Sequence, residues 1–140
     1  RKEEQSGQIL RNFKGKRILL AEDNELNAEI AMELLGESGL ETEHVTDGIK
    51  CVETLKAKPE DYYDLILMDI QMPHMDGYEA TKIIRALNDP RSRIPIIAMT
   101  ANAFEEDRQR AFEAGMDAHI AKPIDVKILF STLAQVLGEE

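Results

Sequence analysis

Short apolar segments of the sequence repeatedly end in polar side chains that a hydrophobic core does not need. Glu22 and Asp23 follow the first such segment, and Asp69, Thr100 and Lys122 each end a later one. An acid after a strand is, taken alone, most simply a solvated loop residue or a helix cap, because Asp and Glu favour those positions. Their recurrence at the ends of successive segments instead indicates a shared site.

The residue types at these ends are those of a phosphoryl-transfer site. Clustered carboxylates repel one another unless a cation or protons neutralise them. An all-oxygen set with room for water and a phosphate suits Mg²⁺ better than zinc, which needs His or Cys. Asp69 would then be the nucleophile, with Glu22 and Asp23 holding the metal. Lys122 would supply a mobile positive charge for a phosphoryl oxygen, and Thr100 a hydroxyl that can follow it.

The segments that must position these residues alternate between strands and helices. Compact apolar runs predict buried strands, and one weaker alternating run predicts an edge strand. In chain order the predicted strands span 17–22, 40–45, 64–69, 94–100 and 117–122. Apolar residues at helical spacing predict an amphipathic helix after each strand. The predicted helices span 26–37, 48–56, 78–87, 104–114 and 126–137.

Strict alternation of strand and helix predicts a doubly wound α/β domain, in which helices cover both faces of a five-stranded parallel sheet. With the strand order 2-1-3-4-5, the first and third strands are neighbours, so Glu22, Asp23 and Asp69 converge. Ligands in such folds bind beyond the carboxyl ends of the strands, where the strand order reverses. We expect this domain over residues 17–138, and a linker or lead-in over residues 1–16, which have too few apolar positions for a packed element.

Composition narrows the class of protein. The 140-residue chain has a formal net charge of -10, from 27 acidic and 17 basic residues, which argues against direct binding of nucleic acid or an anionic membrane. Cys51 is the only cysteine, so no intrachain disulfide is expected and a cytoplasmic setting fits best. No apolar run reaches the roughly 20 residues that span a bilayer. Because the chain begins with Arg1, we expect a processed chain or a segment of a longer protein.

The sequence resembles the response-regulator receiver domains over roughly residues 17 to 138. The resemblance is carried by the acidic pair in LLAEDNELN, the acceptor in LILMDIQMPHMDGYEATKIIR, the threonine in IPIIAMTANA and the lysine in GMDAHIAKPI. In detail the sequence is similar to the receivers of hybrid sensor histidine kinases. The resemblance implies a flavodoxin-like, CheY-like fold and an aspartate-phosphorylated switch in a two-component phosphorelay.

The resemblance also implies roles for individual residues. Asp23 and Asp69 would bind Mg²⁺ through their side chains, the backbone carbonyl of Gln71 would be a third ligand, and Glu22 would act partly through water. The peptide bond between Lys122 and Pro123 would be cis, which an X-Pro bond adopts more readily than any other.

The implied phosphoryl donor is the phosphohistidine domain of a histidine kinase, and a histidine phosphotransfer domain is a further implied partner. The sequence has no glycine-rich phosphate loop, kinase phosphoacceptor helix or DNA-binding helix pair, so we expect it to receive a phosphoryl group rather than make one from ATP. Such a domain would catalyse its own phosphorylation and dephosphorylation, which leaves open whether it counts as an enzyme. In a hybrid kinase it would belong to the cytoplasmic portion of a membrane sensor, and a free-standing single-domain regulator is the alternative.

One position departs from the family pattern. Many receivers have, where this chain has His119, a Tyr or Phe that swings inward on phosphorylation. We therefore expect a switch formed by Thr100 and His119 in which the imidazole, titratable near neutral pH, has a smaller effect than an aromatic ring. His44 in the edge strand is expected to be a surface residue, His74 lacks the companions of a metal ligand, and Cys51 is expected to pack against the sheet.

Two other classes of function share parts of this pattern. Haloacid-dehalogenase-type phosphatases also use a carboxylate nucleophile and Mg²⁺, but they carry it on the first strand in a D-x-D pattern, whereas Asp69 ends the third predicted strand. Flavodoxin-like cofactor binders share the strand order, but acids at the phosphate-binding end would repel a flavin phosphate. Steady turnover of phosphate monoesters would favour the phosphatase, and a yellow purified protein the flavin binder.

Overall fold

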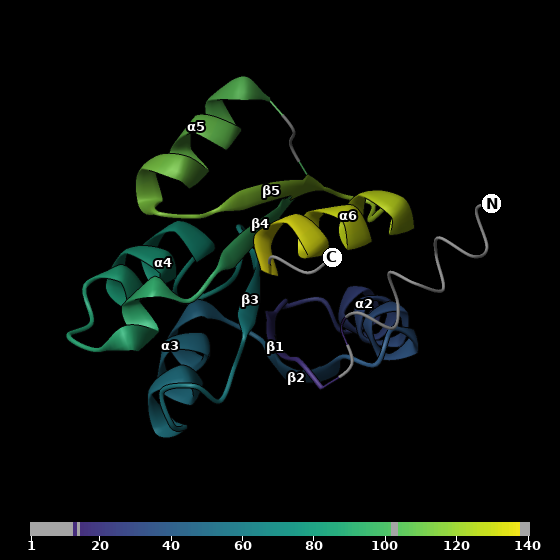
Figure 1. The fold of residues 1–140 in the computed structure, drawn as a ribbon. Coiled ribbons are helices and arrows are strands. Elements are labelled where there is room, and N and C mark those ends of the chain that lie inside the picture. The colour runs from purple at the N-terminus through teal and green to yellow at the C-terminus, as the bar shows by residue number, and fades with distance from the viewer. Residues whose placement is uncertain (1–12, 14, 102–103, 138–140) are drawn as a thin grey trace.

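The structure, a computed structural model, describes residue 13 and residues 15–101 and 104–137. Its elements follow the predicted alternation of strand and helix (Figure 1). The strands are β1 (Arg17–Ala21), β2 (Glu41–Val45), β3 (Leu65–Asp69), β4 (Ile96–Thr100) and β5 (Ala118–Ala121). The helices are α2 (Glu25–Glu37), α3 (Gly48–Ala57), α4 (Gly77–Arg85), α5 (Glu105–Ala114) and α6 (Val126–Leu137), with a short 3₁₀ helix, η1 (Pro90–Arg93).

The strands form one parallel sheet in the order β2-β1-β3-β4-β5, which confirms the predicted fold class and strand order. β1 therefore lies between β2 and β3, and its last residue, Ala21, is paired with Val45 on one side and Met68 on the other. The strand order reverses at β1, so the residues that follow β1 and end β3 meet at the carboxyl edge of the sheet.

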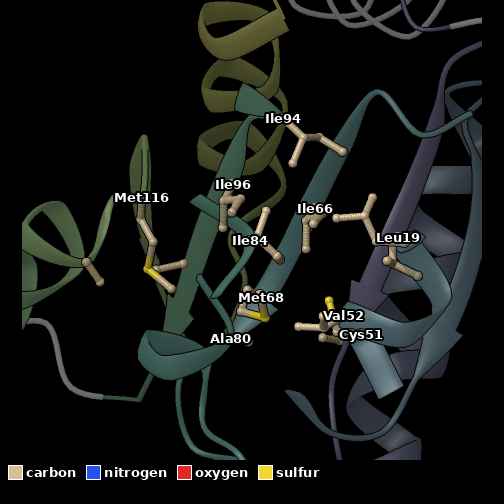
Figure 2. Packing of buried hydrophobic residues seen from close by; sticks show 14 of the residues in the cluster. Leu19, Cys51, Val52, Ile66, Met68, Ala80, Ile84, Ile94, Ile96 and Met116 are labelled. Atoms are coloured by element: carbon tan, nitrogen blue, oxygen red, sulfur yellow. The ribbon is translucent and has the colours of Figure 1, made fainter. Parts of the chain in front are cut away.

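Helices cover both faces of the sheet because alternate residues of each buried strand point to opposite sides. On one face Leu19, Ile66 and Ile96 pack with apolar side chains of α3 and α4, among them Cys51 and Ile84 (Figure 2). Residues of α5 join the same cluster. On the other face the strands pack against α2 and α6. Cys51 is fully buried, as expected from the sequence.

Phe13 lies in the stretch expected to be a linker or lead-in, yet its side chain is fully buried. Its ring stacks on that of Phe130 in α6, with the ring centroids 6.0 Å apart. It belongs to the apolar cluster between the sheet and the helices α2 and α6. Residues 1–12 lie outside the described residues, so the prediction for most of that stretch remains a prediction.

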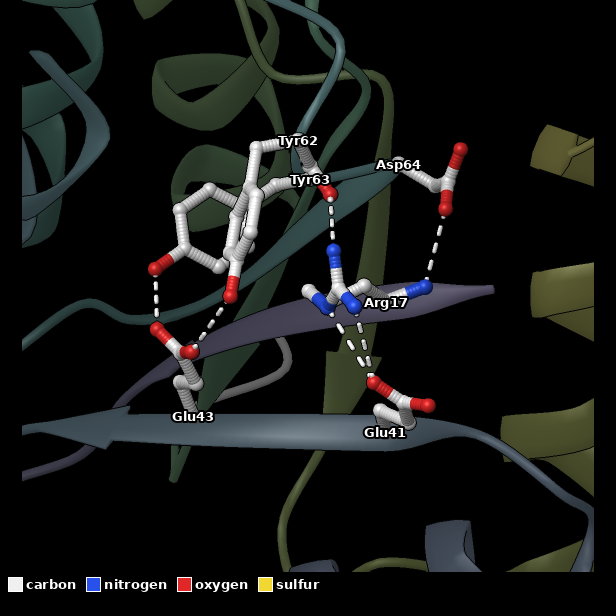
Figure 3. A network of polar contacts seen from close by, with 6 residues as sticks. All are labelled: Arg17, Glu41, Glu43, Tyr62, Tyr63 and Asp64. Carbon is white, nitrogen blue, oxygen red and sulfur yellow. Dashed lines mark hydrogen bonds and ion pairs between the residues drawn. The ribbon is translucent and has the colours of Figure 1, made fainter. Parts of the chain in front are cut away.

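Charged and phenolic side chains contact the edge strand β2, in addition to its pairing with β1 (Figure 3). The guanidinium of Arg17 donates to Glu41 at 3.0 and 3.2 Å and lies 4.0 Å from the centre of the Tyr62 ring. The carboxylate of Glu43 accepts from the hydroxyls of Tyr62 and Tyr63. Since Arg17 and Glu41 begin their strands, this network fastens the amino end of the sheet, opposite the polar strand ends.

The structure moves two predicted boundaries by two residues each, and the other boundaries agree to within one residue. β4 begins at Ile96 rather than at residue 94, and α4 ends at Arg85 rather than at residue 87. Between them lies η1, which was not predicted. Asp89 caps η1 through the Arg91 N–H at 2.8 Å. The Arg85 guanidinium donates to the carbonyls of Ser92 at 2.8 Å and Ile94 at 2.7 Å, which holds this segment against the end of α4.

Candidate functional site

The three predicted carboxylates lie together at the carboxyl edge of the sheet. Asp69 is the last residue of β3, and Glu22 and Asp23 directly follow β1, its neighbour in the sheet. Glu22 and Asp69 are 3% and 4% exposed, whereas Asp23 is exposed. Each offers an oxygen within 4.8 Å of the others. Burying two acids this close is costly unless positive charge faces them.

Lys122 supplies that positive charge. It follows β5, and its backbone N–H donates to the carbonyl of Thr100 at the end of β4. Its ammonium nitrogen lies 2.9 Å from Glu22 Oε1 and 3.1 Å from Asp69 Oδ2, so one cation bridges the two buried acids. The peptide bond between Lys122 and Pro123 is cis, as the resemblance implied.

The two buried acids differ in protonation. Burial, with the adjacent Glu22 carboxylate, raises the pKa of Asp69 to about 7, against the opposing effect of Lys122. Burial also acts to raise the pKa of Glu22, but hydrogen bonds from the Lys122 ammonium and the Asn24 backbone N–H outweigh it, so this pKa lies below its usual value. Burial acts to lower the pKa of Lys122, and its two carboxylate partners outweigh that effect and raise it. As pH falls, Asp69 therefore takes up a proton before Glu22 does.

The acids open onto a cavity of about 530 Å³. Its wall also includes the predicted Thr100 and Gln71, so the structure brings together every predicted site residue except His119. Thr100 is buried and ends β4, next to β3 in the sheet. The remaining lining residues are Asn24, Asn27, Ile70, Met72, Pro73 and Ala101.

The loop of residues 70–76 forms one side of the cavity and is closed at its base by Gly77. The Gly77 N–H donates to the Ile70 carbonyl at 2.8 Å. A Cβ at Gly77 would lie 2.4 Å from the carbonyl oxygen of Asp69, so no larger residue fits without moving the backbone of Asp69. His74, at the turn of this loop, has a φ of 69°, in the left-handed region.

The donor set fits a hard divalent cation. It is made of oxygens, two of its three carboxylates are buried, and Glu22, Asp23 and Asp69 are the one group of this kind among the residues that the structure describes. No histidine or cysteine belongs to it, which disfavours zinc. An open cavity beside the acids leaves room for a phosphoryl group and for the waters that Mg²⁺ usually keeps.

His119 lies apart from this cavity, in a second one that it shares with Arg108 and Phe112 of α5. Its side chain is half-buried, and its Nε2 atom has no hydrogen-bond partner. Burial and the Arg108 guanidinium lower its pKa. Its predicted role as a switch with Thr100 remains a prediction.

His44 is a residue whose place the sequence reasoning missed. It was expected on the surface without a role, but it is half-buried, and its Nε2 donates to the backbone carbonyl of Glu22 at 2.7 Å. The pairing register would have found it, because His44 lies opposite Leu20, two residues before Glu22. The sequence of either strand alone does not predict that register.

The sequence is similar to a family of known proteins over most of its length. The family model described as the response regulator receiver domain matches residues 18–134. Hybrid signal transduction histidine kinase G of Dictyostelium discoideum is 44% identical over 81% of this chain, and histidine kinase 1 of Arabidopsis thaliana is 37% identical over 91% of it. The chain spans 3% and 13% of the lengths of these two proteins. The polar-differentiation response regulator DivK of Brucella ovis is 38% identical over 89% of this chain and 98% of its own.

Solved structures of receiver domains are similar to this structure in fold. The receiver domain of the sensor histidine kinase PA1611 from Pseudomonas aeruginosa, with a magnesium ion coordinated in its active site cleft, is 41% identical, with a TM-score of 0.79 over 89% of this chain and 98% of that one. The signal receiver domain of a signal transduction histidine kinase from Syntrophus aciditrophicus is 35% identical, with a TM-score of 0.78 over 89% of this chain and 91% of that one. None of the helices that the structure describes has the length and apolar character needed to cross a membrane.

Proposed function

Since the chain belongs to the family of response regulator receiver domains of two-component systems, we propose that Asp69 accepts a phosphoryl group from a phosphohistidine in a Mg²⁺-dependent reaction. The observation that carries this assignment is the contact of one ammonium, that of Lys122, with both Asp69 and Glu22 at the mouth of an open cavity. Glu22, Asp23, Asp69 and the backbone carbonyl of Gln71 are the proposed metal-holding groups.

The residues divide the chemistry between them. A carboxylate oxygen of Asp69 attacks the phosphorus, the bond from phosphorus to the donor imidazole breaks, and the electron pair of that bond returns to the imidazole nitrogen. Bound Mg²⁺ would neutralise charge on the phosphoryl oxygens. Lys122, already beside Asp69, can pair with a phosphoryl oxygen, and Thr100 can donate its hydroxyl to another. Glu22 stays ionised and remains available to hold the cation.

Acetyl phosphate with Mg²⁺ tests the assignment without a protein donor. Mass mapping should place the acyl phosphate on Asp69 alone, and Asp69→Asn should take up no label. Label on Glu22 or Asp23, or full labelling of Asp69→Asn, would refute the assignment. Steady turnover of phosphate monoesters would point instead to the phosphatase alternative.

We place the domain in a hybrid sensor histidine kinase, on the cytoplasmic side of the membrane. Supporting this context are the identities of 37% and 44% to receivers within far longer histidine kinases, and a single cysteine, Cys51, which is free and buried. The similarity to DivK, whose whole length the match nearly covers, keeps the free-standing regulator as the alternative.

The protein donor is proposed to dock on α2. Leu26 and Ile30 are 65% and 49% exposed and lie one helical turn apart on α2, which begins three residues after Glu22. Ile30 also lines a cavity with Pro123 and Ile124, and Lys122 and Glu22 border both this cavity and that of the acids. An apolar surface continuous with the acceptor site suits the phosphohistidine domain of a kinase or phosphotransfer protein.

A charge placed on this surface separates docking from chemistry. Leu26→Asp should slow phosphoryl transfer from a phosphorylated histidine kinase or phosphotransfer domain at least about tenfold, while phosphorylation by acetyl phosphate stays unchanged. Phe112→Asp is the matched control, because Phe112 is 54% exposed on α5, across the sheet from α2. Equal slowing by both variants, or none by Leu26→Asp, would exclude α2 as the docking surface.

A further inference from the structure

Residues 44–48 comprise the end of β2, the two residues that join it to α3, and the first residue of α3. They contribute no carboxylate to the proposed metal site, but they contact both of the loops that carry its ligands. One contact is made to Glu22, after β1, and another to Met75, in the loop after β3. Those loops approach the cavity from neighbouring strands. A single segment that fastens both of them controls the distance between the ligands they carry.

The first loop is fixed at Glu22 through both of its backbone polar groups, the N–H and the carbonyl. The N–H of Glu22 donates to the Val45 carbonyl at 3.0 Å, which continues the β1–β2 pairing beyond the last strand residue. The carbonyl of Glu22 accepts from His44 Nε2 at 2.7 Å. A carbonyl can only accept, so His44 must carry a proton on Nε2, which holds for the charged ring and for one neutral tautomer. This contact orients the peptide that joins Glu22 to Asp23.

The second loop is fixed by the first residue of α3. The N–H of Gly48 donates to the Met75 carbonyl at 3.0 Å. A Cβ at Gly48 would lie 2.5 Å from that carbonyl oxygen and 2.9 Å from the Met75 Cγ, so the close approach requires glycine. Asp47 is buried and caps α3 through the Lys50 N–H, which keeps the N–H of Gly48 free to point at the loop.

We propose that residues 44–48 form a brace that sets the geometry of the metal site, with His44 and Gly48 as positioning residues. His44 holds the Glu22–Asp23 peptide, and Gly48 holds the loop on which Gln71 lines the cavity. The inference rests on the proposed function, because it assigns Mg²⁺ to this cavity. Groups that orient metal ligands typically change metal affinity about 10- to 100-fold when they are lost.

The role of His44 in the brace is tested by titrating Mg²⁺ into the protein in a calorimeter. His44→Leu should weaken Mg²⁺ binding about tenfold. His44→Gln should restore most of it, because the glutamine amide nitrogen can reach the position of Nε2 and donate to the same carbonyl. A merely structural role would leave the affinity of both folded variants unchanged. Equal weakening in Gln and Leu variants would also overturn the proposal.

The role of Gly48 in the brace can be tested against a matched control, another helical glycine of the chain. Gly48→Ala should weaken Mg²⁺ binding about tenfold, whereas Gly36→Ala, in α2 with nothing within 4 Å of the added Cβ, should leave it unchanged. Urea unfolding in EDTA checks that each variant is folded. A folded Gly48→Ala variant with wild-type Mg²⁺ affinity would overturn the positioning role of Gly48.

Amide hydrogen exchange in the wild-type protein tests the brace without any substitution. By reciprocity, Mg²⁺ that needs the brace must also stabilise it. The Gly48 amide should therefore exchange at least about tenfold more slowly at saturating Mg²⁺, while amides in the last turn of α6, which open by local fraying away from the cavity, keep their rates. An unchanged Gly48 rate in a protein that binds Mg²⁺ refutes the brace alone. Failure of the wild-type protein to bind Mg²⁺ refutes the proposed function and the brace with it.

Discussion

The ammonium of Lys122 has two carboxylate partners, Glu22 and Asp69, and in the proposed function this double contact would decide how the site responds to phosphorylation. Its distances to Glu22 and Asp69 are 2.9 and 3.1 Å, so the same charge stabilises both buried acids. A phosphoryl group on Asp69 would bring further negative oxygens next to the ammonium, which would then pair with the group of higher charge. Because the Lys122 N–H donates to the Thr100 carbonyl, we expect movement of the lysine to shift the ends of both β4 and β5.

Lys122→Ala should separate metal binding from the conformational response. We expect the variant to keep Mg²⁺ binding, because the oxygen ligands remain. It should lose the amide chemical-shift changes that beryllium fluoride, with Mg²⁺, produces in α5 and β5 of the wild-type protein, because the link between Asp69 and the strand ends is gone. His119→Ala should reduce these changes less. Shifts that reach α5 undiminished in Lys122→Ala would contradict this mechanism.

The raised pKa of Asp69 predicts a pH-dependent cost in stability. In the unfolded chain an Asp has a pKa near 3.9, whereas in the folded protein Asp69 has a pKa of about 7. Between these values the folded state binds more protons, so the free energy of unfolding falls as pH rises from about 4 to about 7. Asp69→Asn removes this dependence. In EDTA, urea unfolding should show Asp69→Asn gaining stability over wild type from pH 5 to pH 8, by roughly 2 kcal/mol or more.

Saturating Mg²⁺ is the control for that measurement. A cation neutralises the carboxylates of the wild-type protein but loses a ligand in Asp69→Asn. The stability difference should therefore shrink or reverse when Mg²⁺ is added at pH 8. A difference between the two proteins that does not change with pH would contradict the assignment of the raised pKa to Asp69.

At the scale of helices and strands, the sequence carried the topology but not the contacts between elements. Asp69 could be placed at the carboxyl edge because apolar runs, turns and alternation are local signals that agree with one another. The bond from His44 to Glu22 depends on strand register. No single segment carries the signal for the His44 contact, whereas η1 has a local one, the capping Asp89 followed by Pro90 at the first helical position, which was overlooked.

The close packing of Gly77, which closes the loop after β3, predicts that a larger residue there lowers the stability of the protein. Gly77→Ala places a Cβ 2.4 Å from the Asp69 carbonyl oxygen and 3.0 Å from the Met68 Cγ, so β3 or α4 must shift. We expect a loss of roughly 1–3 kcal/mol in the free energy of unfolding. Gly36→Ala, a helical glycine with open space around it, should be neutral or slightly stabilising. Urea titration of both variants checks this, and equal stabilities would show that the loop yields without cost.

For the whole molecule, the two faces of the sheet differ in how they are closed. The face covered by α3, α4 and α5 is closed by helices that follow β2, β3 and β4 in the chain. The face covered by α2 and α6 also needs Phe13, a residue from before the first strand, to fill the space beside Phe130. The sequence did not predict this, because one aromatic residue in a polar stretch has no periodicity to indicate that it is buried.

Phe13 should therefore contribute to stability as a core residue and not as part of a linker. Phe13→Ala removes a fully buried ring and its stacking on Phe130, and we expect a loss of about 3 kcal/mol in the free energy of unfolding. Phe104→Ala is the matched control, because Phe104 is 67% exposed and its truncation should cost less than about 0.5 kcal/mol. Mg²⁺ affinity should stay unchanged in both variants, since neither ring lines the cavity of the acids. If urea unfolding gives the same stability for Phe13→Ala as for wild type, the folded unit begins at β1 and the burial of Phe13 contributes nothing to it.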